Sequence, residues 1–397
     1  MRHKGEAGQV LPLIAVCLAA LMGFGGMAID VGYWRYAQHE QQNATDAAAL
    51  GGAQQLLYSG CPNPGAAVTA AKNDATSGGY TDGSNNVTVA VSNPPAVTFA
   101  SDSCAVSVQI HRTHVATWFS KFYGYAGGMN ETTKAVATLS SSGAGTGCIY
   151  LLNMTTNSNF NGANITSKCG ILINDTANFN GARINAPSIT YGGGKPNENG
   201  AVFTAATPAP MLPVEDPCPE IAGCTYLTNN PPSSGSCTSF NGNGYAGVLN
   251  PGCYSNLNLN GANVTLNPGT YVLNGSSNFN GSTITGNGVT IYVTASGSAP
   301  NFNGAKVTLT PPSSGPNSGV LYYQVPTNTG NPNFNGSSNS YTGLFYAPGA
   351  SSVNFNGANG GYVVLVFGGW NFNGGNALDF GSPPGGQSII RKAVLAE

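Results

Sequence analysis

The chain has 397 residues, a formal net charge of −2 and 7% charged residues, whereas an ordinary soluble domain has roughly 25%. That length allows about two or three domains, and neutral polar residues must keep them in solution. The near-zero charge and the absence of a basic stripe in the sequence argue against a nucleic-acid partner.

The first thirty residues predict a membrane anchor. Residues 10–29 form an uncharged run that matches the roughly 30 Å hydrocarbon core of a bilayer, so we expect a transmembrane helix there. Residues 1–9 would be a cytoplasmic tail, because Arg2 and Lys4 stay on the cytoplasmic side and leave the body of the chain outside. A cleaved secretory signal is the alternative. It is disfavoured because the run is long and no clear cleavage site closes it.

Residues 30–58 predict a continuation of the same helix, since alanine and glutamine favour helix. Ala37, Ala44, Ala48 and Leu57 fall near one face and form a narrow packing seam. The seam has two interpretations, which the sequence does not separate: packing on the chain's own domain, or docking to another helix of an assembly.

Three segments of this region resemble a known family. Residues 8–10, 28–32 and 42–50 are similar to the N-terminal module of TadG-like proteins, which belong to the Tad (Flp) pilus-assembly machinery, and the resemblance covers about residues 5–57. The residues that carry it are Gly8, Gln9, Asp30, Gly32, Gln42, Asn43, Asp46, Ala47 and Ala48.

The resemblance implies a single-pass protein of the bacterial inner membrane. Its N-terminus would be cytoplasmic, its body periplasmic or surface-exposed, and its partners pilus-assembly proteins. Related pilins carry a glutamate five residues after their processing site. A cut after Gly5 would place Val10 there instead, so the resemblance does not extend to prepilin processing.

Residues 59–147 predict a small α/β domain with a pilin-like plan. Alternating apolar and polar residues indicate strands over 87–91, 104–110 and 132–139, and residues 115–123 suggest one short helix. His111 and His114 form the chain's one His-x-x-His pair. A metal site would need more ligands than Asp102 and Cys104 can supply, so we expect neither metal nor cofactor.

Cysteines outside the apolar run are even in number, which indicates disulfides and an oxidising compartment. A metal site is disfavoured because no Cys-x-x-Cys occurs and histidine is scarce. Pairing between sequence neighbours is our hypothesis, although the sequence allows other connectivities: Cys61 with Cys104, Cys148 with Cys169, Cys218 with Cys224, and Cys237 with Cys253.

A repeat fills residues 148–397. The motif Asn-Phe-Asn-Gly and its variants recur with a step near twenty residues, and their central positions are Phe160, Phe179, Phe240, Leu259, Phe279, Phe302, Phe334, Phe355 and Phe372. Such a period with short strands predicts a parallel β-solenoid of about nine coils, in a mainly β protein. A leucine-rich repeat is disfavoured, because leucine is sparse and no helical half-repeat appears.

Within each coil we expect the aromatic side chain to point inward, forming a stacked ladder, because side chains alternate along a strand. The asparagines would form either amide ladders or an outer polar stripe. Insertions are expected near 191–237 and 310–332. The first would be a disulfide-stapled excursion loop or a break between two parts of the rod.

The acidic residues of the solenoid predict no enzyme, because none recurs at the coil period and solenoid polysaccharide enzymes need clustered carboxylates. They are Asp175, Glu198, Glu215, Asp216, Glu220, Asp379 and Glu397. The leading hypothesis is a membrane-anchored structural or assembly component of a Tad-type pilus. The alternatives are an anchored adhesin that binds glycans or surfaces through its solenoid face, and a polysaccharide-processing enzyme.

Overall fold

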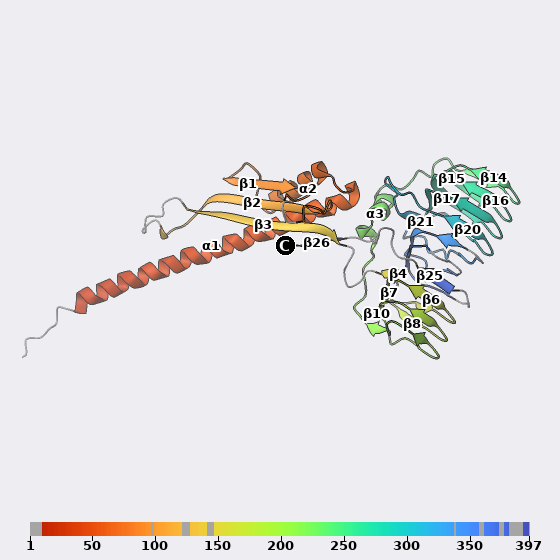
Figure 1. Ribbon diagram of the computed structural model, residues 1–397, viewed down its shortest axis with the longest axis horizontal. Helices are drawn as coiled ribbons and strands as arrows, with labels where there is room; N and C mark the ends of the chain where they lie inside the picture. Colours follow the sequence, from red (N-terminus) through yellow and green to blue (C-terminus); the bar gives the residue numbers. More distant parts are fainter. Residues whose placement is uncertain are drawn as a thin grey trace, which may run out of the picture. The chain divides into compact units, whose positions relative to one another are not determined.

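The computed structural model describes residues 10–96, 99–120, 128–140, 147–336, 339–356, 361–372, 377–380 and 392–396. The chain forms two compact units, shown in Figure 1. The N-terminal unit comprises Met1–Ser140 with Lys392–Glu397, and the C-terminal unit comprises Ser141–Arg391. The repeat predicts that the solenoid continues to the end of the chain, but the last strand belongs to the N-terminal unit.

One helix, α1 (Val10–Ser59), runs without a break through the apolar run and the predicted continuation. Its 50 residues span about 75 Å at 1.5 Å per residue. Large apolar side chains between Leu13 and Ile29 are exposed. Farther along, Ala44 and Ala48 are buried in a cluster with apolar residues between Ala67 and Ala137 of the same unit. The alanine seam therefore packs on the chain's own unit, which is the first of its two interpretations.

A second helix, α2 (Pro64–Ser77), was not predicted. The Asn63 side chain caps it by accepting a hydrogen bond from the Ala66 N–H at 3.2 Å, and Pro64 suits the first turn. Ala67, Ala71 and Ala75 recur every four residues and are fully buried. Alanine is a weak apolar signal, which is why this amphipathic pattern was missed.

Four antiparallel strands complete the N-terminal unit, in the order β1 (Val87–Ser92), β2 (Val106–Val115), β3 (Met129–Ser140) and β26 (Lys392–Leu395). The three strands expected from alternation are confirmed as β1, β2 and β3. The short helix expected over 115–123 is not formed over residues 115–119, where Val115 ends β2 and 116–119 are not helical. Ser120 is in a 3₁₀ conformation, and residues 121–123 lie outside the described residues.

The C-terminal unit is a parallel β-solenoid, as predicted. Across the described residues its longest sheet has 11 strands. Their order is β12 (Ala209–Pro210), β10 (Ile189–Tyr191), β7 (Gly170–Ile173), β4 (Gly147–Leu151), β24 (Val363–Phe367), β23 (Gly343–Ala347), β21 (Val320–Gln324), β19 (Val289–Val293), β17 (Gly269–Asn278), β15 (Gly252–Asn258) and β13 (Thr238–Asn241).

The other strands of the coils form smaller parallel sheets. The first has the order β11 (Val202–Phe203), β9 (Arg183–Asn185), β6 (Asn164–Ser167) and β25 (Ala377–Phe380). The second has the order β14 (Ala246–Leu249), β16 (Asn263–Leu266), β18 (Thr283–Gly286), β20 (Lys306–Leu309) and β22 (Ser340–Tyr341). The third is the pair β5 (Asn157–Asn159) and β8 (Thr176–Asn178).

The coil count is about eleven rather than nine, because two coils lack the aromatic motif. In one of them, Glu198 occupies the phenylalanine position between Asn197 and Asn199. The turn is nevertheless kept: the Asn197 side chain accepts the Asn199 N–H at 3.2 Å, and Gly200 has φ +67°. The other begins at β12. Counting motifs therefore undercounts coils.

The coils do not stack in sequence order. The chain enters the rod at β4 and winds outward through β7 and β10 to β12; it resumes at the opposite end with β13 and winds back until β24 pairs with β4. Residues 211–237 make the crossing and contain η2 (Cys218–Glu220) and α3 (Ala222–Asn229).

The first insertion is therefore a break between two parts of the rod, the second of its two interpretations. Its bounds were too wide, because residues 191–210 contribute β11 and β12. The second insertion, 310–332, was also drawn too wide, because it contains β21, a strand of the long sheet. In the first place two coils lack the aromatic motif, and in the second the coil keeps the motif at Phe334 but is longer than the others.

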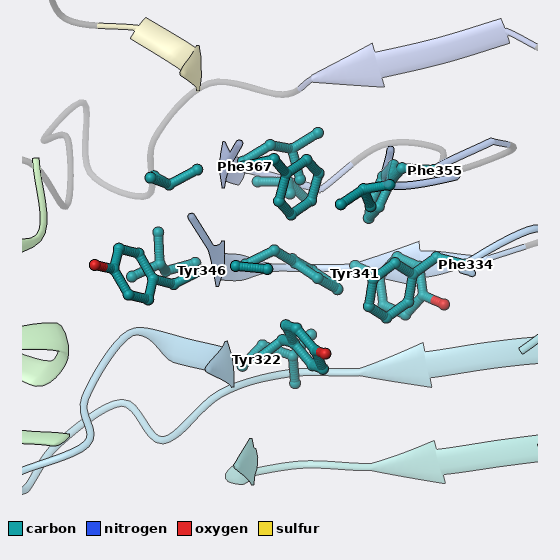
Figure 2. Close-up of a cluster of buried hydrophobic side chains, with 14 of the residues drawn as sticks. Tyr322, Phe334, Tyr341, Tyr346, Phe355 and Phe367 are labelled. Atoms are coloured by element: carbon teal, nitrogen blue, oxygen red, sulfur yellow. The ribbon is translucent and has the colours of Figure 1, made fainter. Parts of the chain in front are cut away.

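The aromatic positions of the motif line the core. Eight of the nine central residues are buried; Phe240, in the terminal coil, is half-buried. Phe279 and Phe302 stack with centroids 4.4 Å apart. Figure 2 shows the neighbouring cluster, in which Phe334 and Phe355 both meet Tyr341 of β22, and Phe334 also meets Tyr322 of β21 in the long sheet.

The asparagines of the motif serve the corners and also form short ladders. The first asparagine side chain accepts the N–H two residues on, as Asn278 does from Asn280 at 3.1 Å, and Gly281 then turns the chain with φ +61°. Between coils, Asn258 Nδ2 donates to Asn241 Oδ1 at 2.9 Å.

Four disulfides follow the neighbour pairing: Cys61–Cys104, Cys148–Cys169, Cys218–Cys224 and Cys237–Cys253. Each closes a loop within one unit. Cys17, inside the apolar run, is free.

Candidate functional site: the membrane-proximal end of the N-terminal unit

Asp30 lies directly after the apolar run and is nearly buried, with 6% of its surface exposed. Its carboxylate accepts three backbone N–H groups: Trp118 at 2.8 Å, Phe119 at 2.9 Å and Ser120 at 2.6 Å. These donors belong to residues 116–120, which follow β2 and which we call the membrane-proximal loop. Asp30 thus attaches this loop to α1.

The hydrogen bonds set the charge state of Asp30. Desolvation alone would raise the pKa of this carboxyl, but the N–H groups of Trp118, Ser120 and Phe119 hold the pKa below its usual value. Asp30 is therefore ionised at neutral pH, and its charge is met by backbone donors rather than by a basic side chain.

Aromatic packing completes the attachment. The Trp118 ring meets Tyr33 edge-on with centroids 4.6 Å apart. Phe119 lies against Gly26, where an added Cβ would come within 2.7 Å of the ring. A glycine at this position therefore leaves room for the phenylalanine.

A second polar cluster ties α1 to the sheet. Gln41 is fully buried, and its Nε2 donates to the Ile110 carbonyl at 2.9 Å and to Thr133 Oγ1 at 3.2 Å. Thr45 and Thr133 share a hydrogen bond of 2.6 Å between their hydroxyls. Beside it, Gln42 Nε2 donates to the Lys134 carbonyl at 3.0 Å. Sequence reasoning missed Gln41, because nothing in the sequence distinguishes a buried glutamine in a helix from an exposed one.

Some residues that carry the family resemblance are buried in these contacts, and others are exposed to solvent. Gly8 and Gln9 lie outside the described residues. Asp30 and Ala48 are buried, Gln42 and Asp46 are half-buried and joined by a hydrogen bond of 2.7 Å, and Gly32, Asn43 and Ala47 are exposed.

The structure gathers no catalytic set in the part of the chain it describes. No group of three His, Cys, Asp or Glu residues placed to hold a metal occurs there. His111 contacts Thr132 at 2.8 Å, and His114 contacts Thr113 at 3.1 Å. An open groove of about 370 Å³ on the N-terminal unit's sheet has Lys134 as its only charged lining residue.

These features define a class: a protein with an exposed apolar helix, a small α/β unit folded around that helix, and a β-solenoid. The segment Pro12–Leu57 is long and apolar enough to cross a membrane, and its most apolar window is 6% buried by the rest of the chain.

Comparison with known proteins places the helix in a family. Residues 8–55 match the family described as "Putative Flp pilus-assembly TadE/G-like". The N-terminal module is thus that of TadE/G-like proteins, as the sequence motifs indicated. No curated protein and no solved structure matches the chain.

Proposed function

We propose that this protein is a membrane-anchored, non-catalytic structural component of a Tad-type pilus or a related surface-adherence system. The observation that carries the proposal is the coincidence of two features on α1. The TadE/G-like match covers residues 8–55, and the same helix exposes large apolar side chains from Leu13 to Ile29.

The proposed topology places the N-terminus in the cytoplasm and both units outside it, at the inner membrane. Arg2 and Lys4 precede the apolar run, in agreement with the positive-inside rule. Four disulfides suit an oxidising compartment such as the periplasm.

Partner contacts are proposed on the free face of α1. The exposed motif residues Gly32, Asn43 and Ala47 lie within about 60° of each other around the helix, at 100° per residue. The buried motif residues on the other side already hold the chain's own unit. The exposed stripe is therefore the part of the motif available to a pilus-assembly protein.

Deletion of the gene tests the role in a cell that makes the pilus. Loss of surface pili is expected, restored by the wild-type gene. Asn43→Trp should fail to restore them at unchanged protein level, whereas Thr76→Trp, a matched change at an exposed site on α2, should restore them. Normal pili in the deletion strain would refute the proposal.

An adhesin is the second candidate, favoured by the outer face of the sheet β14–β22. Thr265, Thr285 and Thr308 occupy one register position on three successive coils and are exposed; the first two hydroxyls lie 3.2 Å apart. Such a flat row of hydroxyls could meet a regular glycan. Binding to a glycan array that is lost on changing all three to valine would favour it.

A further inference from the structure

The membrane-proximal loop exposes two large aromatic side chains. Trp118 is 53% exposed and Phe119 37% exposed, although both backbone N–H groups are fixed by Asp30. Rigidly held, exposed aromatic residues on a loop have no role in the core of their own unit. We therefore expect these two side chains to contact something outside the N-terminal unit.

The position of this loop along α1 indicates what the two side chains contact. Phe119 lies against Gly26, three residues before the last apolar residue of the run, Ile29. At 1.5 Å per residue, that contact is about 4.5 Å inside the end of the apolar segment. A helix that spans the bilayer through residues 10–29 therefore carries the loop to the boundary between the hydrocarbon core and the headgroups.

The polar groups of the loop are hydrogen-bonded within the protein, so the loop can lie at this depth in the bilayer. Three of its N–H groups are satisfied by the Asp30 carboxylate, and the carboxylate is in turn shielded by them. Thr117 and Ser120 bond to each other through their hydroxyls. The loop therefore presents aromatic rings rather than unpaired donors, and tryptophan favours the membrane–water interface.

We propose that the membrane-proximal loop is a second membrane attachment, in which Trp118 and Phe119 sit among the lipid headgroups beside the transmembrane helix. The inference rests on the membrane-anchoring part of the proposed function. Two attachment points fix the tilt and the rotation of the N-terminal unit relative to the bilayer, which a single helix cannot do. The unit then rests on the membrane surface without a stalk.

Tryptophan quenching in vesicles tests this. The full-length Trp34→Phe variant retains Trp118 and the buried Trp370 of the solenoid; Trp34→Phe/Trp118→Phe retains Trp370 alone and gives the baseline. Both are reconstituted into phosphatidylethanolamine–phosphatidylglycerol vesicles whose acyl chains are brominated either near the headgroup or near the chain end. Resistance to alkaline extraction shows separately that the anchor is inserted.

The expected result is quenching of Trp118 that is at least twofold stronger with bromine near the headgroup, together with an emission maximum blue-shifted from that of tryptophan in water. Quenching no greater than the baseline in extraction-resistant protein would overturn the inference and leave the anchor intact. Protection of Trp118 from aqueous acrylamide without quenching by brominated lipid would also overturn it, because a second copy of the chain would then cover the loop. Protein that is extracted by alkali would instead refute the anchor itself.

Discussion

Gly25 and Gly26 are neighbours on α1 with different surroundings. An added Cβ at Gly25 meets nothing within 4 Å, whereas at Gly26 it comes within 2.7 Å of the Phe119 ring. We predict that Gly26→Ala displaces the membrane-proximal loop and that Gly25→Ala does not. Alanine favours helix equally at both sites, so the pair isolates the contact.

The measurement is the rate of protease cleavage within residues 116–120 in detergent. A several-fold faster cleavage is expected for Gly26→Ala alone. Equal rates in the two variants would mean that Phe119 does not need the glycine.

Asp175 is a buried carboxyl in the solenoid. Its Oδ2 accepts hydrogen bonds from Thr156 and Ser158, both at 2.9 Å, while its Oδ1 has no partner. Burial outweighs these bonds and raises the pKa of Asp175 from 3.8 to about 6. The folded state therefore binds the proton more tightly than the unfolded chain does.

The raised pKa of Asp175 makes the free energy of unfolding depend on pH. Between pH 3.8 and about 6 the folded state holds more protons, so this group lowers the free energy of unfolding as pH rises. We predict that Asp175→Asn stabilises the C-terminal unit at pH 8 by about 1–3 kcal/mol and has little effect at pH 3.5.

Urea unfolding followed by the fluorescence of Trp370 measures this, because Trp370 lies in the same cluster: its backbone N–H donates to Ser158 Oγ at 3.2 Å. Glu198→Gln, at an exposed carboxyl, is the control and should show no such pH-dependent gain. A gain at pH 3.5 as large as at pH 8 would contradict the assignment.

At the scale of the element, α1 has two faces with different tasks. Gln41 is buried against β2 and β3, while Asn43 is exposed two residues away. Gln41→Ala should lower the free energy of unfolding of the N-terminal unit by about 1–3 kcal/mol, because it removes two hydrogen bonds at a buried site.

Asn43→Ala should change stability by less than about 0.5 kcal/mol, as surface substitutions usually do. Denaturant unfolding in detergent, with near-ultraviolet circular dichroism as the probe, distinguishes the two. A destabilised Asn43→Ala variant would show that this face also packs on the chain itself.

What the sequence could predict was local. Uncharged length predicted the helix, alternation predicted β1 to β3, and the step near twenty predicted coils with inward phenylalanines such as Phe302. Residues far apart in the chain decided the rest. Nothing in the sequence near Asp30 shows that its partners are at 118–120. A strand as short as β26 carries no signal that it pairs with β3 rather than with a strand of the solenoid.

The order of the coils was beyond sequence reasoning for a related reason. Every coil offers the same backbone edge and a similar Asn-Phe-Asn-Gly corner, so any coil can stack on any other. The order is set by where residues 211–237 cross. The first and last coils meet at a seam where β24 pairs with β4. The Phe160 and Trp370 rings pack edge-on across it, with centroids 5.2 Å apart.

At the scale of the whole molecule, the solenoid is an insertion between two paired strands, because Ser140 at the end of β3 pairs with Lys392 at the start of β26. Within the solenoid, the first and last coils are likewise neighbours. A cut in the crossing segment would divide the rod into two parts. No disulfide would join them, since Cys218–Cys224 and Cys237–Cys253 fall on opposite sides of residues 233–234.

We predict that the two parts stay together after such a cut. A protease site inserted between Ser233 and Ser234, both exposed, should yield fragments that co-migrate on a sizing column and separate only in denaturant. Removing residues 392–397 should leave this unchanged, because the β4–β24 seam remains. Adding Leu365→Asp, at a fully buried site in β24 opposite Ile149, should lower the denaturant concentration at which the fragments separate. Fragments that part without denaturant would show that the coils are not closed by this seam.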